Sequence, residues 1–269
     1  MNKYEILNGD CLEKMLNIPD SYVDLTVTSP PYDNLRIYGG AIEGWSFNKF
    51  KEIAKQLYRV TKEGGVVVWV VGDATVNGSE TGTSFKQALY FMECGFSLHD
   101  TMIYEKINPI PQNHNRYEQC FEYMFVFSKG KPRTFNPIKE ETKNAGKTFD
   151  WGNRKTEMDV NQCRRHRSSE GRVVKKYKIK RNIFRYSVGG GKTGHPAVFP
   201  EALAQDHILS WSNEGDLVFD PFVGSGTTGK MAILNNRLFL GVELNEQYFE
   251  TAKSRCLDAY QQKTSISLK

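Results

Sequence analysis

The sequence of 269 residues lacks any apolar run of 18 residues, the length that a membrane-spanning helix requires. Its first ten residues, MNKYEILNGD, have neither the apolar core nor the cleavage pattern of a secretory signal peptide. These absences argue against a membrane-spanning or exported protein. We therefore expect an intracellular protein.

Paired metal-binding or disulfide spacings are also missing. The five cysteines are odd in number and include no C-x-x-C pair, and the five histidines show no H-x-x-x-H spacing. A disulfide framework or a zinc site normally shows such spacings. We expect reduced, individually placed thiols and no structural metal. The cysteines are Cys11, Cys94, Cys120, Cys163 and Cys256.

Positive charge is concentrated in one segment. The net charge is +5, but residues 131–192 hold 18 Lys and Arg against 6 Asp and Glu. Charge runs are usually solvated surface loops. The alternative is a segment that binds nucleic acid, with basic side chains on phosphates and interleaved aromatic rings as stacking or wedge surfaces. Those rings belong to Tyr177, Phe184 and Tyr186.

Strand-like and helix-like patterns alternate at both ends of the chain and lapse within residues 130–192. The alternation predicts an α/β fold with a parallel sheet and right-handed crossovers. For example, apolar residues recur with a 3.6-residue period over residues 46–65. The expected strands are 23–29, 66–73, 100–106, 122–130, 216–222 and 239–244, and the expected helices are 46–65, 84–96, 200–212, 227–234 and 245–259.

A stiff turn follows the first of these strands, in the stretch VTSPPYDNL (residues 27–35). Each proline fixes φ near −65° and removes a hydrogen-bond donor, so the strand ends here. The common interpretation is a strand-ending turn with a half-buried tyrosine. The alternative is a rigid functional turn, which presents a serine hydroxyl, backbone carbonyls and an aromatic ring.

A glycine-rich loop follows a later strand, in VFDPFVGSGTTG (residues 218–229). Such a loop at the start of a helix suits a nucleotide-type ligand, but the G-K-[ST] ending of a P-loop is missing. Glu243 ends the next expected strand, at the offset at which an acidic residue binds ribose hydroxyls. The loop also matches the literal G-x-G-x-x-G pattern of dinucleotide-binding proteins, so NAD is one possible ligand. Asp220, which would lie against a pyrophosphate, instead favours a ligand with a cationic amino group.

Three segments together resemble the S-adenosylmethionine (SAM)-dependent DNA amino-methyltransferases of the circularly permuted β group. They are TSPPY (28–32), HPAVFPEAL (195–203) and DPFVGSGTT (220–228), in that order. The resemblance implies a Rossmann-like class I methyltransferase sheet with a basic target-recognition insertion. It also implies SAM as cofactor, double-stranded DNA as substrate and a role in DNA methylation and restriction-modification. Further expectations from the resemblance are a homodimer, a cognate restriction endonuclease, and a location in the cytoplasm of a prokaryote or phage host, associated with the nucleoid.

The family's functional residues can be placed on this sequence by its motifs. The catalytic motif corresponds to Ser29, Pro30, Pro31 and Tyr32. The resemblance assigns Asp10 to the SAM adenine, Asp220 to the methionine moiety and Glu243 to the ribose. The remaining expected cofactor-binding residues are His195, Pro196, Phe199, Phe222, Gly224, Ser225, Gly226, Thr227 and Thr228.

The rigid turn has a chemical explanation within this family. An exocyclic amino group is a weak nucleophile because its lone pair is delocalised into the base. The Ser29 hydroxyl and the Pro30 carbonyl would accept its two hydrogens, while Tyr32 would stack on the extruded base. Transfer then depends on positioning and electrostatics, without a covalent intermediate. A cytosine-C5 enzyme would need a Pro-Cys nucleophile, and none of the five cysteines follows a proline.

Several functions stay open. Within the family, S-P-P-Y favours cytosine N4, and adenine N6 is the alternative. More distant alternatives are an RNA or protein methyltransferase, which the motif order disfavours, and a catalytically silent DNA-binding module, which the intact motifs disfavour.

The expected organisation has three parts. Residues 1–129 would form the catalytic half of the methyltransferase domain, 130–192 the target-recognition region, and 193–269 the SAM-binding half. The recognition region would place most of its basic side chains on DNA phosphates. The expected DNA-binding residues are Arg164, Arg165, Arg167, Lys175, Lys176, Lys178, Lys180 and Arg181.

Overall fold

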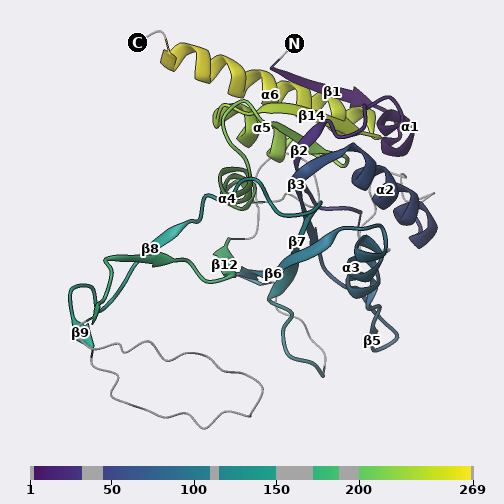
Figure 1. Cartoon of the computed structure of the whole chain (residues 1–269). Coiled ribbons are helices and arrows are strands. Elements are labelled where there is room, and N and C mark those ends of the chain that lie inside the picture. The colour runs from purple at the N-terminus through teal and green to yellow at the C-terminus, as the bar shows by residue number, and fades with distance from the viewer. Residues whose placement is uncertain (1–2, 32–44, 110–114, 150–171, 188–199, 268–269) are drawn as a thin grey trace. The chain divides into compact units, whose positions relative to one another are not determined.

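The computed structural model describes residues 3–31, 45–109, 115–149, 172–187 and 200–267 (Figure 1). These residues divide into two compact units. Residues 1–136 together with 182–269 make up the larger unit, and Pro137–Arg181 make up the smaller one. The larger unit contains the main sheet and its helices.

The described strands of the larger unit form an eight-stranded sheet in the order β1-β14-β13-β2-β3-β7-β6-β12. The pairings of β1, β14, β13, β2 and β3 are parallel, as is that of β6 with β12. The predicted Rossmann-like α/β class is confirmed. The strands are β1 (Tyr4–Asn8), β2 (Val23–Thr28), β3 (Thr61–Val71), β6 (Ser97–Lys106), β7 (Phe121–Ser128), β12 (Ile183–Tyr186), β13 (Leu217–Asp220) and β14 (Leu238–Glu243).

The expectation of a wholly parallel sheet was wrong at one strand. Strand β7 lies between β3 and β6 and is antiparallel to both. A parallel neighbour would require a crossover of a dozen or more residues, usually a helix. Among the described residues between β6 and β7 no helix occurs, so the chain returns directly as an antiparallel partner.

Helices cover both faces of the sheet (Figure 1). On one face α1 contacts α2, and α2 contacts α3; on the other, α4 contacts α5, and α5 contacts α6. The last helix runs to Ser267, beyond the expected end at residue 259, because no glycine or proline interrupts it. The helices are α1 (Cys11–Met15), α2 (Phe47–Val60), α3 (Thr83–Glu93), α4 (Glu201–Trp211), α5 (Thr227–Leu234) and α6 (Glu246–Ser267).

Short strands complete the described structure. In the larger unit, β4 (Thr75–Val76) and β5 (Ser79–Glu80) form a hairpin. In the smaller unit, β8 (Lys139–Glu141) pairs with β11 (Tyr177–Ile179), and β9 (Thr148–Phe149) pairs with β10 (Arg172–Val173). Among the described helices, none combines the length and apolar character needed to cross a bilayer.

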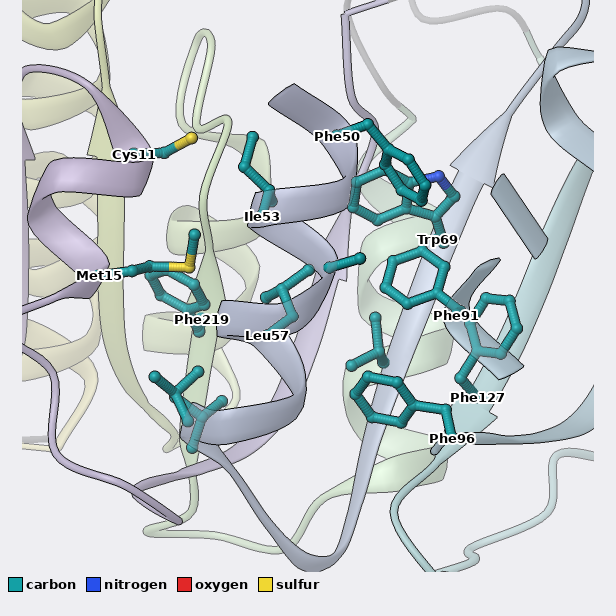
Figure 2. Close-up of a cluster of buried hydrophobic side chains, with 14 of the residues drawn as sticks. Cys11, Met15, Phe50, Ile53, Leu57, Trp69, Phe91, Phe96, Phe127 and Phe219 are labelled. Atoms are coloured by element: carbon teal, nitrogen blue, oxygen red, sulfur yellow. The ribbon is translucent and has the colours of Figure 1, made fainter. Parts of the chain in front are cut away.

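The main aromatic core lies between the sheet and helices α1, α2 and α3 (Figure 2). The rings of Trp69 on β3 and Phe91 on α3 meet edge to face with centroids 5.0 Å apart. The Trp69 indole donates a buried hydrogen bond of 2.8 Å to the Gln87 side chain. The 3.6-residue period of α2 explains its share of this core, because Phe50, Ile53 and Leu57 fall on one face.

Replacing Phe91 by alanine should lower the free energy of unfolding by about 3–5 kcal/mol, because a fully buried ring leaves a cavity. Urea unfolding followed by circular dichroism measures this loss. Leu89→Ala, at an exposed position of the same helix, is the matched control and should change stability by less than about 0.5 kcal/mol. Equal losses in both variants would contradict this description of the core.

Candidate active site at the sheet's switch point

The strand order places a topological switch between β13 and β2. From β13 the chain winds outward through β14, and from β2 it winds outward in the opposite direction through β3. In open α/β sheets, ligands bind at such a point, outside the carboxyl ends of the strands. Thr28 ends β2, Asp220 ends β13 and Glu243 ends β14. The structure therefore brings the S-P-P segment and the glycine loop to the same end of the strands.

Thr28 and Asp220 form a hydrogen bond across this switch point. The Thr28 hydroxyl donates to Asp220 Oδ1 over 2.6 Å, and both side chains are buried. The backbone N–H of Phe222 donates to the same oxygen over 3.0 Å. Burial raises the pKa of the Asp220 carboxyl to about 6, although hydrogen bonds from Thr28, the Phe222 N–H and Thr228 oppose the rise. Asp220 is thus a buried acid whose described hydrogen-bond donors are all neutral.

The S-P-P segment begins immediately after this hydrogen bond. Ser29 is half-buried, and Pro30 is buried beside it. The Thr228 hydroxyl donates to the carbonyl of Val27 over 3.3 Å, so helix α5 also contacts the end of β2. The strand end that carries the expected catalytic motif is therefore fixed from the glycine-loop side.

The glycines of the loop have different roles in the structure. Gly226 has a left-handed φ of 84°, and a Cβ there would lie 2.9 Å from the Cα of Ala252. A Cβ on Gly229 would lie 2.6 Å from the Phe239 ring and 2.7 Å from the Cys256 sulfur. These two glycines allow close packing of the loop and α5 against α6 and β14. Gly224 also has a positive φ, of 54°, and its N–H faces a carboxylate.

The carboxylate that faces the Gly224 N–H belongs to Glu243. Its Oε2 accepts from the Gly224 N–H over 2.7 Å, and its Oε1 accepts from the Asn245 N–H over 2.9 Å. Burial raises the pKa of Glu243, and the two backbone donors oppose this effect. A carboxylate has about four acceptor positions, so each oxygen keeps capacity for another donor. The two backbone N–H groups thus fix the orientation of this carboxylate.

Asp10, the expected adenine contact, is the N-cap of α1. Its Oδ1 accepts from the N–H groups of Leu12 and Glu13, and its Oδ2 pairs with Lys49 of α2. Burial alone would raise the pKa of Asp10, but the Lys49 hydrogen bond and the two backbone donors outweigh it and lower the pKa. Asp10 follows β1 at the same edge, since the Gly9 N–H donates to the Glu243 carbonyl over 2.9 Å.

Sequence reasoning did not nominate several residues that the structure places here. Thr28 lies inside the quoted T-S-P-P-Y motif, so its position was a usable signal. Lys49 and Trp45 carried no signal, because only the tertiary fold brings them near Asp10 and Phe222. The Trp45 and Phe222 rings meet edge to face with centroids 5.5 Å apart.

Some expected site residues lie outside the described part of the chain. They are Tyr32, Arg164, Arg165, Arg167, His195, Pro196 and Phe199. The remaining cofactor candidates of the loop are described, and Ser225, Thr227 and Thr228 are all buried.

Two aromatic residues of the basic segment are not surface rings, contrary to expectation. Phe184 and Tyr186 are buried on β12, at the edge of the main sheet. The Tyr186 hydroxyl donates to Asp206 of α4 over 2.7 Å. The reason is strand alternation, since every second side chain of β12 faces inward. Tyr177 does remain exposed, on β11 of the smaller unit.

The smaller unit pairs some of its basic residues with acidic ones. Lys178 lies 2.9 Å from Glu140, and Lys176 lies 3.9 Å from Glu141, across the β8–β11 ladder. Both pairs are largely exposed, so they hold the side chains only weakly. The described candidates Lys175, Lys180 and Arg181 flank the same strand.

Comparison with known proteins identifies the family. A family model described as DNA methylase matches residues 23–254. The chain belongs to this DNA methylase family. The methylase is 55% identical to the orphan methyltransferase M.BamHII of Bacillus amyloliquefaciens over 249 residues, which cover 89% of this chain and 90% of the relative. It is 29% identical to the DNA adenine methyltransferase YhdJ of Escherichia coli K12, with coverage of 93% and 81%.

Solved structures agree with this assignment. The SAM complex of M1.HpyAVI is 26% identical to the methylase, with a TM-score of 0.64 and coverage of 94% of this chain and 98% of that one. The cytosine-N4-specific PvuII methyltransferase has a TM-score of 0.70 at 20% identity, with coverage of 97% and 93%, and shows the fold alone. The family model is described as DNA methylase and YhdJ is an adenine enzyme, so family membership shows a DNA methyltransferase without fixing which base this chain modifies.

The raised pKa of Asp220 predicts a pH dependence of stability. The folded-state pKa of about 6 exceeds the ordinary value of 3.8, so the folded methylase binds this proton more tightly than the unfolded chain does. Stability should therefore fall as pH rises from about 4 to about 6 and then level off. Asp220→Asn should show a smaller fall, because the contribution of Asp220 is lost while that of Glu243, whose pKa burial also raises, remains. Urea unfolding at pH 4.5 and pH 7 would measure the difference.

Asp258→Asn, on the exposed side of α6, is the control and should retain the wild-type dependence. If Asp220→Asn and the wild type showed the same decrease in stability between the two pH values, the buried-acid description of Asp220 would be incorrect.

Proposed function

We propose that this DNA methyltransferase transfers a methyl group from SAM to cytosine N4 at specific sites in double-stranded DNA. The observation that carries the proposal is the hydrogen bond between Thr28 and Asp220, which joins the strand end that leads into the S-P-P segment to the strand end that leads into the glycine loop. Ser29, rather than an acidic residue or asparagine, supports cytosine over adenine by family resemblance.

The residues at the switch point fit SAM. Asp220 is a buried carboxyl with neutral donors, and buried charges in proteins are normally paired, so a cationic amino group would complete its surroundings. Glu243 keeps acceptor capacity for ribose hydroxyls while two backbone N–H groups hold it in place. When bound, SAM supplies an electrophilic methyl group on its sulfonium.

The S-P-P segment would activate and orient the target amino group. The Ser29 hydroxyl and the Pro30 carbonyl accept its two hydrogens, which directs the nitrogen lone pair away from the base. These acceptors are rigid because the prolines fix the backbone and Thr28 is anchored to Asp220. Preorganised polar groups require no rearrangement during the reaction. Tyr32 would stack on the base once it is flipped out of the duplex.

The proposal predicts the modified base. Double-stranded DNA incubated with the protein and methyl-labelled SAM should release labelled N4-methylcytosine after digestion and nucleoside chromatography. Ser29→Ala should reduce kcat about tenfold or more, because one acceptor hydrogen bond contributes about 1.5 kcal/mol. Ser254→Ala, at an exposed position of α6, is the matched control and should retain wild-type activity.

Each other outcome has a definite meaning. Label in N6-methyladenine would keep the mechanism and overturn the choice of cytosine. Label in RNA or protein, with none in DNA, would overturn the substrate. Full activity of Ser29→Ala would remove Ser29 from the reaction.

We also propose that the smaller unit carries the target-recognition region. Its support is the excess of Lys and Arg in residues 131–192 and the exposed β11 strand. Changing Lys175, Lys176, Lys178 and Lys180 to Gln should weaken DNA binding, because fewer phosphates are neutralised. The slope of log K against log salt should become shallower by about 0.9 for each phosphate that the variant no longer neutralises, as fluorescence anisotropy at several salt concentrations can measure.

The double variant Glu140→Gln, Glu141→Gln in the same unit is a control that should change DNA affinity in the opposite direction. Removing these carboxylates from the β8–β11 ladder should strengthen binding, because their lysine partners are then available to phosphates. An unchanged affinity and salt slope in the lysine variant would assign recognition to another surface. A homodimer and a cognate restriction endonuclease remain predictions from the family resemblance alone.

A further inference from the structure

Behind the glycine loop, helix α6 directs an arginine at the loop backbone. One nitrogen of Arg255, Nη1, donates to the Ser225 carbonyl over 2.6 Å and to the Ser225 hydroxyl over 2.9 Å. The same nitrogen lies 3.4 Å from the Thr227 hydroxyl. The Arg255 side chain is only 18% exposed. The guanidinium therefore contacts the part of the loop that leads into the first residue of α5.

The second nitrogen of the guanidinium contacts helix α4 directly and is linked through it to helix α5. Arg255 Nη2 donates to Glu201 Oε1 over 2.9 Å, and Lys230 Nζ of α5 donates to the same oxygen over 2.7 Å. Glu201 is the first residue of α4. One carboxylate thus holds two cations, and the network connects α4, α5, α6 and the loop.

The peptide group between Ser225 and Gly226 is hydrogen-bonded through both its carbonyl and its N–H. The Ser225 carbonyl accepts from Arg255, and the Gly226 N–H donates to the Val223 carbonyl over 2.9 Å. Gly226 lies against Ala252, one turn of α6 before Arg255. The orientation of this peptide sets the start of α5, where the first backbone N–H groups of a helix have no partner within the helix.

We propose that Arg255 is a positioning residue for cofactor binding. It holds the 225–227 backbone in the shape that receives the amino-acid part of SAM, and Glu201 with Lys230 keeps the guanidinium in place. The inference rests on the proposed SAM site. The adenosine part would be held elsewhere, since the Glu243 carboxylate is oriented by Gly224 and Asn245 and has no described contact with Arg255.

Arginine suits this position better than lysine. Its planar fork offers five N–H donors in fixed directions, whereas lysine offers a single rotating ammonium. Arg255 uses this geometry to reach the loop with one nitrogen and Glu201 with the other. A lysine could keep the charge but could not hold both partners in the same geometry.

The test is calorimetric titration of the full chain with two ligands. One is SAM, and the other is 5′-methylthioadenosine, which keeps the nucleoside and the sulfur but lacks the amino-acid part. Arg255→Met should raise the Kd for SAM about tenfold, and Arg255→Lys should raise it by a smaller factor. The Kd for 5′-methylthioadenosine should stay within about twofold. In DNA methylation assays, KM for SAM should rise more than kcat falls.

Lys253→Met is the matched control. Lys253 lies on the same helix, and its described ion pair is an exposed one with Glu250, so both Kd values should be unchanged. If Arg255→Met does not fold, as urea unfolding would show, Arg255→Lys and Glu201→Gln test the same prediction. Both should weaken SAM binding without weakening 5′-methylthioadenosine binding.

Two results would overturn the inference while leaving the proposed function intact. In the first, the folded Arg255 variants bind SAM as tightly as the wild type. In the second, both ligands bind more weakly by the same factor, which would show a general structural role. Failure of the wild-type protein itself to bind SAM would instead overturn the proposed function, and this inference with it.

Discussion

The hydrogen bond between Thr28 and Asp220 connects two segments that are almost two hundred positions apart in the chain. Because β2 and β13 are neighbours at the switch point, their carboxyl ends meet there, and the hydrogen bond fixes one end against the other. Everything proposed for the site depends on this junction. The S-P-P segment leaves one side of it, and the glycine loop leaves the other.

The two strands that meet at this junction come from separated stretches of the chain. The chain forms β2 and β3 early, leaves the main sheet for the smaller unit, and returns to form β13 and β14. The larger unit is therefore built from two separated stretches, which the sheet joins through β2–β13 and β1–β14 pairing. Close packing then sets the site's details, since Gly226 and Gly229 bring the loop and α5 against α6 and β14.

Much of the fold followed from local pattern, and much of the site did not. The periodic and apolar patterns predicted both α2 and β3, but the boundary was wrong: residues 61–65, expected at the end of the helix, belong to β3. Strand β7 shows the limit of local pattern. Whether a strand runs parallel or antiparallel to its neighbours depends on the length of the connection and not on the strand's own residues. The motifs predicted which segments converge, but Lys49 and Arg255 sit on helices with no local signal of a role. Phe184 and Tyr186 were misplaced because basic neighbours obscured the alternation of β12.

The most direct test of the active-site assignment is a crystal structure of the protein with S-adenosylhomocysteine, the product that remains after methyl transfer. We predict the ligand at the carboxyl ends of β13 and β14, with its ribose hydroxyls on Glu243, its amino group beside Asp220 and its sulfur facing Ser29. Binding at any other edge of the sheet, or with the ribose away from Glu243, would contradict the central claim that the Thr28–Asp220 junction organises the active site.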